Sequence, residues 1–408
     1  MTGPGIIIVG AGQAGVQAAF SLREEGYDGR IQVFGDEPIL PYQRPPLSKA
    51  YLTEGRSERL TLRSSEMLDQ LHIEISTGNP VERIDRAASC VFTTDGRSHG
   101  YDQLILATGT RARALALPGG TLTNVLTLRN ISDADRLREA LGCSSRVVII
   151  GGGFIGLEVA AVARSMGCDV TVVEAGNRIM ERAVSAPTSA HMLRLHRLEG
   201  VQIRYRVGVC RILGDDGGRA TGVLLADDQI VSADLVLVAV GAVANDDLAR
   251  GAGLDVANGI RVDGMLRTSD PTIFAIGDCA EFPAETGRIR LESVQNAVDQ
   301  AKCVARCITG HPETYHKVPW FWSDQGKNKL QIAGLTSGAD DVVHLPAGDE
   351  RKFTAICFRA DTLLGVETVN APGDHIAART LLARSPVPTR NQLAAMDFDL
   401  RRAAQGGA

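Results

Sequence analysis

Residues 10–15 read GAGQAG and residues 151–156 read GGGFIG, so the pattern G-x-G-x-x-G occurs twice in this chain. Each copy directly follows a short apolar run, at residues 5–9 and 146–150 respectively. A buried strand, a glycine turn and a helix in this order form the phosphate-binding element of a Rossmann-like domain. One copy is a weak signal, but two copies predict two dinucleotides and an exchange of electrons between them.

The three glycines of each pattern have different tasks. The first permits a tight turn, the second lets the backbone approach a pyrophosphate, and the third lets the helix pack closely on the strand. The phosphate then meets the free N–H groups and the positive dipole end of the helix. An ordinary buried turn between a strand and a helix is the alternative. We predict cofactor contacts at Gly10, Gly12, Gly15, Gly151, Gly153 and Gly156.

An acidic residue follows each pattern at the end of a second predicted strand. Asp36 follows the strand expected at residues 31–34, and Glu174 follows the one at 170–173. A carboxylate in this position accepts hydrogen bonds from ribose hydroxyls and repels a 2′-phosphate. The sequence therefore predicts that the second site prefers NADH to NADPH, unless Glu174 is merely a solvated carboxylate at a strand end.

Composition excludes several classes of protein. The chain has 408 residues, 44% of them hydrophobic, and a formal net charge of −5 without a long basic run, which argues against nucleic-acid binding. No apolar stretch is long enough to suggest a membrane span, and the histidines show no metal-ligand spacing. The eight scattered cysteines fit a reduced, cytoplasmic protein. Cys303 and Cys307, on one face of a predicted helix, are expected to be small buried residues rather than a redox or metal pair.

The two nucleotide-binding units are not simply in tandem. Apolar strands expected at residues 104–107 and 272–276 enclose the whole second fingerprint, and the second strand leads into Asp278, where a cofactor contact is expected. We therefore predict a first nucleotide domain from residues 1–112 and 242–317, with the second, residues 113–241, inserted into it. A third, α+β domain is predicted at 318–408 from strands at 330–333, 353–358 and 363–367 and helices at 375–382 and 391–395. The tail from Arg401 onward is expected to be mobile.

Several further segments resemble one known family. They are GDEP at 35–38, PYQRPPLSK at 41–49, ATG at 107–109, residues 151–158, GD at 277–278, ESVQNA at 292–297 and PWFWSDQ at 319–325. Together they cover essentially the whole chain, which resembles the FAD-dependent NADH:ferredoxin reductases of bacterial oxygenase systems. The resemblance implies an α/β fold with two glutathione-reductase-like Rossmann domains, for FAD and NADH, and a C-terminal α+β domain.

The resemblance also implies roles for individual residues. It gives as FAD contacts Gly10, Gly12, Gly15, Asp36, Arg44, Pro45, Lys49, Thr108, Arg111, Asp278, Val294 and Trp322. It gives as NADH contacts Gly151, Gly153, Gly156, Glu158, Glu174 and Gly241. Val294 is expected to begin a helix whose N–H groups face the flavin, although many relatives carry Trp near this point. Trp322 is expected close to the flavin, and a core position is the alternative for both Trp320 and Trp322.

Lys49 and Glu158 are the candidate catalytic residues. Reduced flavin carries negative charge, which a cation or a helix N-terminus stabilises. Glu158 follows the last fingerprint glycine by two residues. We predict an ion pair between it and Lys49, across the two nucleotide-binding domains, that orients the ammonium group and tunes the flavin potential. The alternatives are a solvated loop lysine and an ordinary helix carboxylate.

The resemblance implies hydride transfer from NADH to FAD, followed by single-electron transfer to a [2Fe–2S] ferredoxin that serves a cytochrome P450 or a Rieske oxygenase. Basic residues that could meet an acidic ferredoxin are Arg288, Arg290, Lys327 and Lys329. A rubredoxin or monodehydroascorbate-type reductase is the alternative within the same fold. An NADH-sensing interaction protein like apoptosis-inducing factor is the alternative outside catalysis. A disulfide reductase is disfavoured because residues 41–49 contain no cysteine.

Overall fold

The computed structural model describes residues 4–285, 287–345 and 348–406. The chain forms two compact units. Unit 1 contains residues 1–43, 57–111 and 242–317, and unit 2 contains residues 44–56, 112–241 and 318–408. Each unit carries one of the two glycine patterns, which fits the insertion of one nucleotide-binding unit into the other.

Unit 1 is built on a parallel sheet with the strand order β3-β2-β1-β6-β18, and β6 continues into an antiparallel ribbon with β5 and β4. All five residues of β1 are buried, as expected for a parallel sheet covered on both faces. The strands expected at 5–9, 31–34, 104–107 and 272–276 are confirmed. The bounds are β1 (Gly5–Val9), β2 (Ile31–Phe34), β3 (Ile73–Ser76), β4 (Val81–Asp85), β5 (Cys90–Thr93), β6 (Ser98–Leu106) and β18 (Ile273–Ala275).

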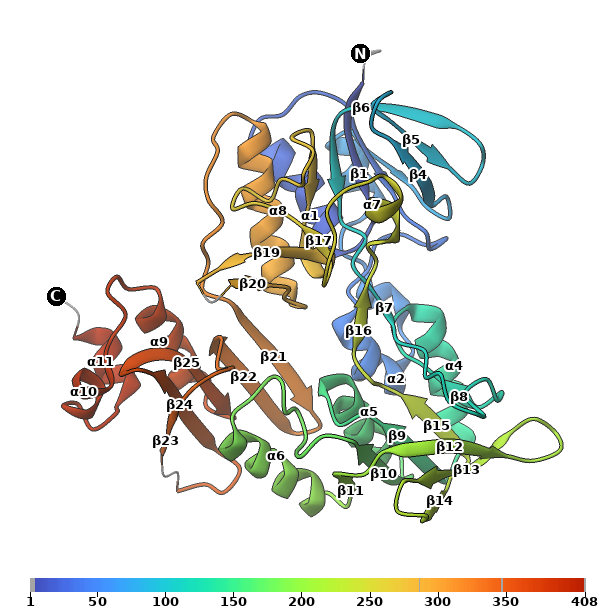
Figure 1. Cartoon of the computed structure of the whole chain (residues 1–408), viewed down its shortest axis with the longest axis vertical. Coiled ribbons are helices and arrows are strands. Elements are labelled where there is room, and N and C mark those ends of the chain that lie inside the picture. Colours follow the sequence, from blue (N-terminus) through green and yellow to red (C-terminus); the bar gives the residue numbers. More distant parts are fainter. Residues whose placement is uncertain (1–3, 286, 346–347, 407–408) are drawn as a thin grey trace. The chain divides into compact units, whose positions relative to one another are not determined.

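Two long helices of unit 1, α1 (Gln13–Glu24) and α8 (Val294–Ile308), pack against each other although they lie far apart in the sequence (Figure 1). Between β18 and α8 the chain forms the short helix η3 (Gly277–Cys279). The remaining elements are η2 (Ser57–Leu60), α3 (Ser65–Gln70), β7 (Thr110–Ala112), β16 (Ala242–Ala244), α7 (Asp247–Gly251), β17 (Ile260–Arg261), β19 (Ala280–Ala284) and β20 (Gly287–Ile289). The strands β7 and β16 pair where the chain leaves unit 1 and where it returns.

The second glycine pattern lies in a parallel sheet of unit 2 with the order β11-β10-β9-β15-β8. A small antiparallel sheet, β12-β13-β14, accompanies it. The strand bounds are β8 (Val125–Leu126), β9 (Arg146–Ile150), β10 (Asp169–Glu174), β11 (Gln202–Tyr205), β12 (Val209–Gly214), β13 (Ala220–Leu225), β14 (Ile230–Ser232) and β15 (Leu235–Val238). The helices are η1 (Pro45–Ser48), α2 (Ala50–Glu54), α4 (Ile131–Cys143), α5 (Phe154–Ser165) and α6 (Ala186–Leu198).

The C-terminal part of unit 2 is an antiparallel sheet with the order β21-β22-β25-β24-β23, accompanied by three helices (Figure 1). The predicted strands and helices of the α+β domain are confirmed, with shifted ends. The bounds are β21 (Trp320–Gln325), β22 (Asn328–Gly334), β23 (Asp341–Leu345), β24 (Phe353–Arg359), β25 (Thr362–Val369), α9 (Pro372–Leu382), α10 (Arg390–Ala394) and α11 (Leu400–Gln405).

The expectation of a mobile tail from Arg401 was wrong. Asp399 caps α11 by accepting hydrogen bonds from the N–H groups of Arg401 and Arg402, both at 3.0 Å. Leu400 and Ala403, three positions apart, are buried in the same core cluster as α9. The two residues between them are both arginines, so the short apolar face was not recognised in the sequence. Residues 407 and 408 lie outside the described residues.

The predicted domain boundaries at 112/113, 241/242 and 317/318 stay a prediction, because two compact units do not test a division into three. Residues 44–56, which we assigned to the first nucleotide domain, group with unit 2. Among the described residues, no helix is long and apolar enough to cross a bilayer.

Candidate functional site

The first glycine turn joins β1 to α1 in unit 1. Gly10 has a φ of +114°, which L side chains rarely adopt. A Cβ atom on Gly10 would collide with the carbonyl oxygen of Ala107, and one on Gly15 would collide with that of Gly10. A Cβ atom on Gly12 would meet nothing within 4 Å. The turn therefore has no room for a side chain where it faces the sheet, but the space beside Gly12 is free. Gly12 is the N-cap of α1, and no side chain caps this helix.

The second turn repeats this arrangement between β9 and α5 in unit 2. Gly151 has a φ of +112°, and a Cβ atom there would collide with the carbonyl oxygen of Ala239. A Cβ atom on Gly156 would collide with the carbonyl oxygen of Gly151, whereas one on Gly153 would meet nothing within 4 Å. Gly153 is the N-cap of α5 and makes no side-chain cap. The two turns thus have the same open and closed sides.

Both turns fit a dinucleotide pyrophosphate. A phosphate needs space beside the middle glycine and N–H groups without a side-chain acceptor at the start of the helix. Each turn provides both features, so the residues present fit FAD at the first turn and NAD(H) at the second. Any side chain larger than hydrogen at the middle glycine would take up part of this space.

Glu174 is fixed at the end of β10, beside the second turn. Its carboxylate accepts the N–H of Gly152 at 2.7 Å and the N–H of Gly176 at 2.6 Å, one on each oxygen. Each oxygen of an ionised carboxylate has a further lone pair, which a ribose hydroxyl could use. Asp36, the predicted counterpart in unit 1, is exposed and follows β2 by two residues.

Lys49 and Glu158 form the predicted ion pair. Lys49 Nζ lies 2.9 Å from Glu158 Oε2, and Glu158 is only 5% exposed. The lysine follows η1, and the glutamate lies in α5 just after the second glycine turn. Lys49 Nζ also donates to the carbonyl oxygen of Pro45 at 3.1 Å. The pair itself is therefore confirmed, but it does not join two units, because Lys49 and Glu158 both belong to unit 2. Its role in catalysis stays a prediction.

Two serines on the same carboxylate were missed in the sequence. Ser48 Oγ donates to Glu158 Oε2, and Ser323 Oγ donates to Glu158 Oε1 at 2.6 Å. Both serines are buried, Ser48 beside Lys49 in the chain and Ser323 in β21. Both serines lie in segments that carry the family resemblance. Sequence spacing alone, however, does not show that residues 158 and 323 are in contact.

Arg44 and Pro45 stand at the start of η1 in unit 2. Arg44 Nη1 donates to the carbonyl oxygen of Arg129 at 3.1 Å, next to the N-terminus of α4. Pro45 contributes its carbonyl to Lys49. The structure therefore brings the predicted residues 44, 45, 49 and 158 together, and their contacts to FAD stay a prediction.

Thr108 and Arg111 bind the segment by which the chain returns to unit 1. Thr108 Oγ1 donates to the carbonyl oxygen of Asn245 at 2.6 Å, and Arg111 Nη1 donates to that of Ala244 at 3.1 Å. Arg111 also forms an ion pair with Asp247 at 3.1 Å. These contacts give both side chains a structural task at the β7–β16 connection. Gly241, just before β16, has a φ of +99°.

Asp278 and Val294 lie at the two elements expected to face the flavin. Asp278 is in η3, and its carbonyl oxygen accepts a hydrogen bond from Arg290 Nη1 at 2.9 Å. Val294 is the first residue of α8, as predicted, and Ser293 caps this helix. A Cβ atom on Gly277 would lie 2.9 Å from that of Ala14, so the first turn of α1 and η3 approach each other closely within unit 1.

Trp322 lies on the face of β21 opposite to Ser323. Its ring centroid is 5.7 Å from that of Trp320, with 34° between the planes. The Arg379 guanidinium lies 4.3 Å above the Trp320 ring, and the His375 ring meets it edge-on at 5.5 Å. Trp320 is thus packed against α9, and both tryptophans are half-buried.

The four basic residues expected at a docking surface differ in their surroundings. The Arg290 side chain is only 9% exposed and pairs with Glu292 at 2.7 Å. Arg288 donates to the carbonyl oxygens of Val262 and Glu281. Both arginine side chains therefore bind other residues of unit 1. Lys327 and Lys329, around the turn between β21 and β22, are exposed.

Cys303 and Cys307 are buried on α8, as the sequence predicted. Cys303 is 1% and Cys307 6% exposed, and all eight cysteines are free thiols. The shared hydrogen bond lowers the pKa of Cys307 and, together with burial, raises that of Cys303. Among the described residues, no group of three or more His, Cys, Asp or Glu side chains is arranged to hold a metal ion.

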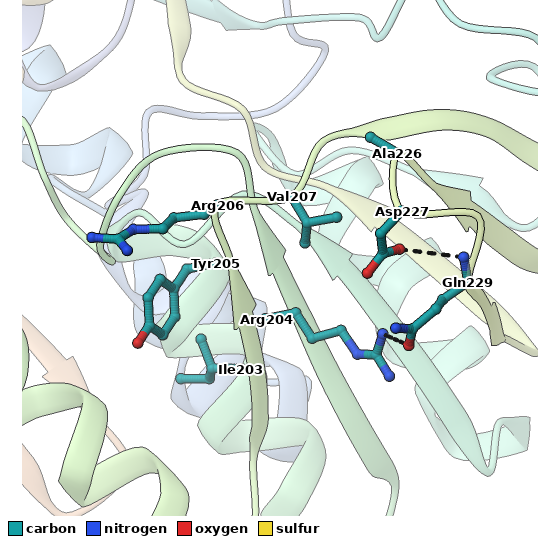
Figure 2. Close-up of a pocket in the computed structure, with 8 residues that line it drawn as sticks. All are labelled: Ile203, Arg204, Tyr205, Arg206, Val207, Ala226, Asp227 and Gln229. Carbon is teal, nitrogen blue, oxygen red and sulfur yellow. Dashed lines mark hydrogen bonds between the residues drawn. The ribbon is translucent and has the colours of Figure 1, made fainter.

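A separate hollow of about 570 Å³ lies along β11 and the turn before β14 (Figure 2). Within it, Arg204 Nη1 donates to Gln229 Oε1 at 2.5 Å. Its lining contains none of the predicted site residues: Ile203, Arg204, Tyr205, Arg206, Val207, Ala226, Asp227 and Gln229.

Comparison with known proteins agrees with this geometry. Residues 4–301 match the family Pyridine nucleotide-disulphide oxidoreductase, and residues 320–404 match Reductase C-terminal. The chain is 50% identical over 401 residues to rhodocoxin reductase from Rhodococcus erythropolis, covering 98% of this chain and 94% of that protein.

Solved structures agree as well. The ferredoxin reductase for the CYP199A2 system from Rhodopseudomonas palustris superposes with a TM-score of 0.95 at 44% identity, covering 98% of this chain and 100% of the other. The reductase of a covalent putidaredoxin reductase–putidaredoxin complex gives a TM-score of 0.94 at 36% identity, covering 100% of both chains.

The chain therefore belongs to the pyridine nucleotide-disulphide oxidoreductase family. Within that family it is an oxidoreductase of the ferredoxin reductase type, and the cofactors of this type are FAD and NAD(H).

Proposed function

We propose that this enzyme transfers hydride from NADH to FAD and passes the electrons singly to a [2Fe–2S] ferredoxin that serves a cytochrome P450 or a Rieske oxygenase. One observation carries this proposal: the chain has two glycine turns that fit a dinucleotide, and the Lys49–Glu158 pair lies just after the second turn. When bound, the two cofactors supply the redox chemistry. The protein supplies position and charge, in the cytoplasm, where NADH is available.

Each predicted residue then has a defined task. The first turn and residues 1–112 and 242–317 hold FAD, the second turn and residues 113–241 hold NADH, and residues 318–408 add Trp322. The N-terminus of α8 at Val294 offers N–H groups and a positive dipole end to the flavin. Asp36, Thr108, Arg111 and Asp278 contribute from unit 1, and Arg44 and Pro45 contribute beside Lys49.

Lys49 is the proposed cation that favours charge on the reduced flavin. Its ammonium group would otherwise rotate freely on a four-carbon chain, and Glu158 and the Pro45 carbonyl fix it. Removing one preorganised charge-stabilising donor from an active site typically costs about 100- to 1,000-fold in rate. We expect Lys49→Ala to slow flavin reduction by NADH on this scale while FAD stays bound.

Steady-state turnover tests the function. The purified holoenzyme should reduce cytochrome c with NADH rapidly only when a [2Fe–2S] ferredoxin is added. Faster transfer to a rubredoxin than to any ferredoxin from oxygenase systems would favour the rubredoxin alternative. A stable complex with NADH that does not turn over would favour the sensing protein.

A further inference from the structure

The Glu158 carboxylate is held by more than its cation. It is 5% exposed, and such a buried carboxylate requires hydrogen bonds on both oxygens as well as a countercharge. Lys49 and Ser48 both bind Oε2. Oε1 is bound by Ser323, which comes from the C-terminal part of unit 2.

Ser323 is in turn oriented by a chain of buried side chains. Gln325 Nε2 donates to Ser323 Oγ at 3.1 Å, so the serine proton is directed to Glu158. The Oε1 atom of Gln325 lies 2.7 Å from His196 Nε2 on α6. These three side chains are each at most 2% exposed.

The direction of the hydrogen bonds follows from the donors available. Because Gln325 donates from its amide NH₂ to the serine, its oxygen must accept a hydrogen bond from the N–H of His196 Nε2. Burial lowers the pKa of His196, which keeps the ring neutral with its single proton on Nε2. The chain therefore runs from His196 through Gln325 and Ser323 to Glu158, with every donor matched to an acceptor.

We propose that Ser323 is a positioning residue for flavin reduction: it fixes Glu158, and through Glu158 it sets the location of the Lys49 ammonium group. This rests on the proposed function. The two serine hydroxyls stabilise the Glu158 charge without neutralising Lys49. The lysine can consequently be shared with a second anion while both oxygens of Glu158 keep a hydrogen bond from a serine. The C-terminal part of unit 2 thereby positions a side chain of the proposed NADH-binding part, through the hydrogen bond from Ser323 to Glu158 Oε1.

The test uses the holoenzyme with Ser323→Ala, Ser323→Thr and Gln325→Ala. Ser144→Ala is the control, because Ser144 Oγ donates to the carbonyl oxygen of Ala140 at 2.7 Å and has no link to Glu158. We expect Ser323→Ala to slow flavin reduction by NADH about five- to tenfold, which is less than the full value of a hydrogen bond to a charged group because Ser323 acts on the lysine only through Glu158. Threonine should restore most of the rate, Gln325→Ala should give a smaller loss, and Ser144→Ala should give none.

Two further measurements separate positioning from a general structural effect. The flavin midpoint potential of Ser323→Ala should shift in the same direction as that of Lys49→Ala, but less. In a double-mutant cycle, Ser323→Ala should have no further effect on the reduction rate once Lys49 is alanine, because it acts through the lysine. Additive effects, or an unchanged potential in Ser323→Ala, would overturn the proposal.

Failure of the proposal and failure of the proposed function are distinguishable. If NADH does not reduce the flavin of the wild-type holoenzyme, the function itself is wrong. If the wild type is reduced and Ser323→Ala behaves as the wild type does, only the positioning role is wrong.

Discussion

At the scale of single residues, we expect Glu174 to decide which nucleotide the second site accepts. Glu174 is locked by two backbone N–H groups, so its charge cannot turn away from a neighbouring phosphate. A like-charge pair at about 4 Å is worth roughly 4 kcal/mol at an effective dielectric near 20, and solvent around this half-buried group reduces that value.

We therefore expect a higher kcat/KM with NADH than with NADPH. Glu174→Gln removes the charge and keeps the shape, so it should lower the NADH:NADPH ratio by about tenfold, which corresponds to about 1.4 kcal/mol. Asp169→Asn, at the opposite end of β10, is the control and should leave the ratio unchanged. A wild-type enzyme that prefers NADPH would contradict the assignment.

His375 is a residue whose protonation opposes folding. It is 2% exposed beside Trp320, and neither ring nitrogen has a hydrogen-bond partner among the described residues. Burial, with a smaller contribution from Arg379, lowers its pKa to about 4.

Between pH 6.5, the ordinary value, and about pH 4, the unfolded chain binds a proton at this position that the folded chain does not. Stability should therefore fall as the pH decreases through this window. His375→Phe should flatten that part of the profile of melting temperature against pH. His311→Phe, at an exposed histidine, is the control for the chemical change. If melting temperature depends on pH in His375→Phe as it does in the wild type, His375 does not contribute to the pH dependence of stability.

At the scale of elements, each strand–turn–helix unit combines one strict packing requirement with one open position. Gly156 in α5 lies against the carbonyl oxygen of Gly151, whereas nothing lies within 4 Å of a Cβ placed on Gly153. Substitution of the last glycine of the fingerprint should therefore affect stability, whereas substitution of the middle glycine should affect cofactor binding.

Gly156→Ala should destabilise the fold by about 1–3 kcal/mol, the usual cost of overpacking, or prevent expression of folded protein. Gly153→Ala should keep nearly the wild-type melting temperature and raise the KM for NADH, because the new methyl group takes up space meant for the pyrophosphate. Calorimetry and steady-state kinetics check the pair. A destabilised Gly153→Ala with an unchanged KM would contradict the role of this turn.

At the scale of the whole molecule, long-range contacts decide how unit 2 is held together. Glu367 in β25 is completely buried and accepts the N–H of Ser185 at 2.8 Å and its hydroxyl at 2.5 Å, at the N-terminus of α6. Together with the contacts of Ser323 with Glu158 and of Gln325 with His196, this contact ties the C-terminal sheet to the part of unit 2 that carries the second glycine turn.

Partner docking also belongs to this scale. Since Arg288 and Arg290 are engaged within unit 1, the lysines of the β21–β22 turn are the better candidates for contact with an acidic ferredoxin. Lys327→Glu should raise the KM for ferredoxin and weaken its dependence on salt, with NADH–ferricyanide reduction unchanged. Lys302→Glu, an exposed lysine on α8, is the control. Equal effects of the two variants would remove the docking assignment.

The sequence by itself determined the two glycine turns, the parallel strands beside them, the start of α8 and the Lys49–Glu158 pair. Turns and strand patterns depend on neighbours a few residues away, whereas the pair was predicted from the roles that the resemblance implies for both residues, together with the charge of reduced flavin. Only the tertiary structure decided that Ser323 binds Glu158, that Arg290 is buried and that the last residues form α11. The physical reason is that hydrogen-bond partners and burial depend on which distant segments fold together, which spacing along the chain does not encode.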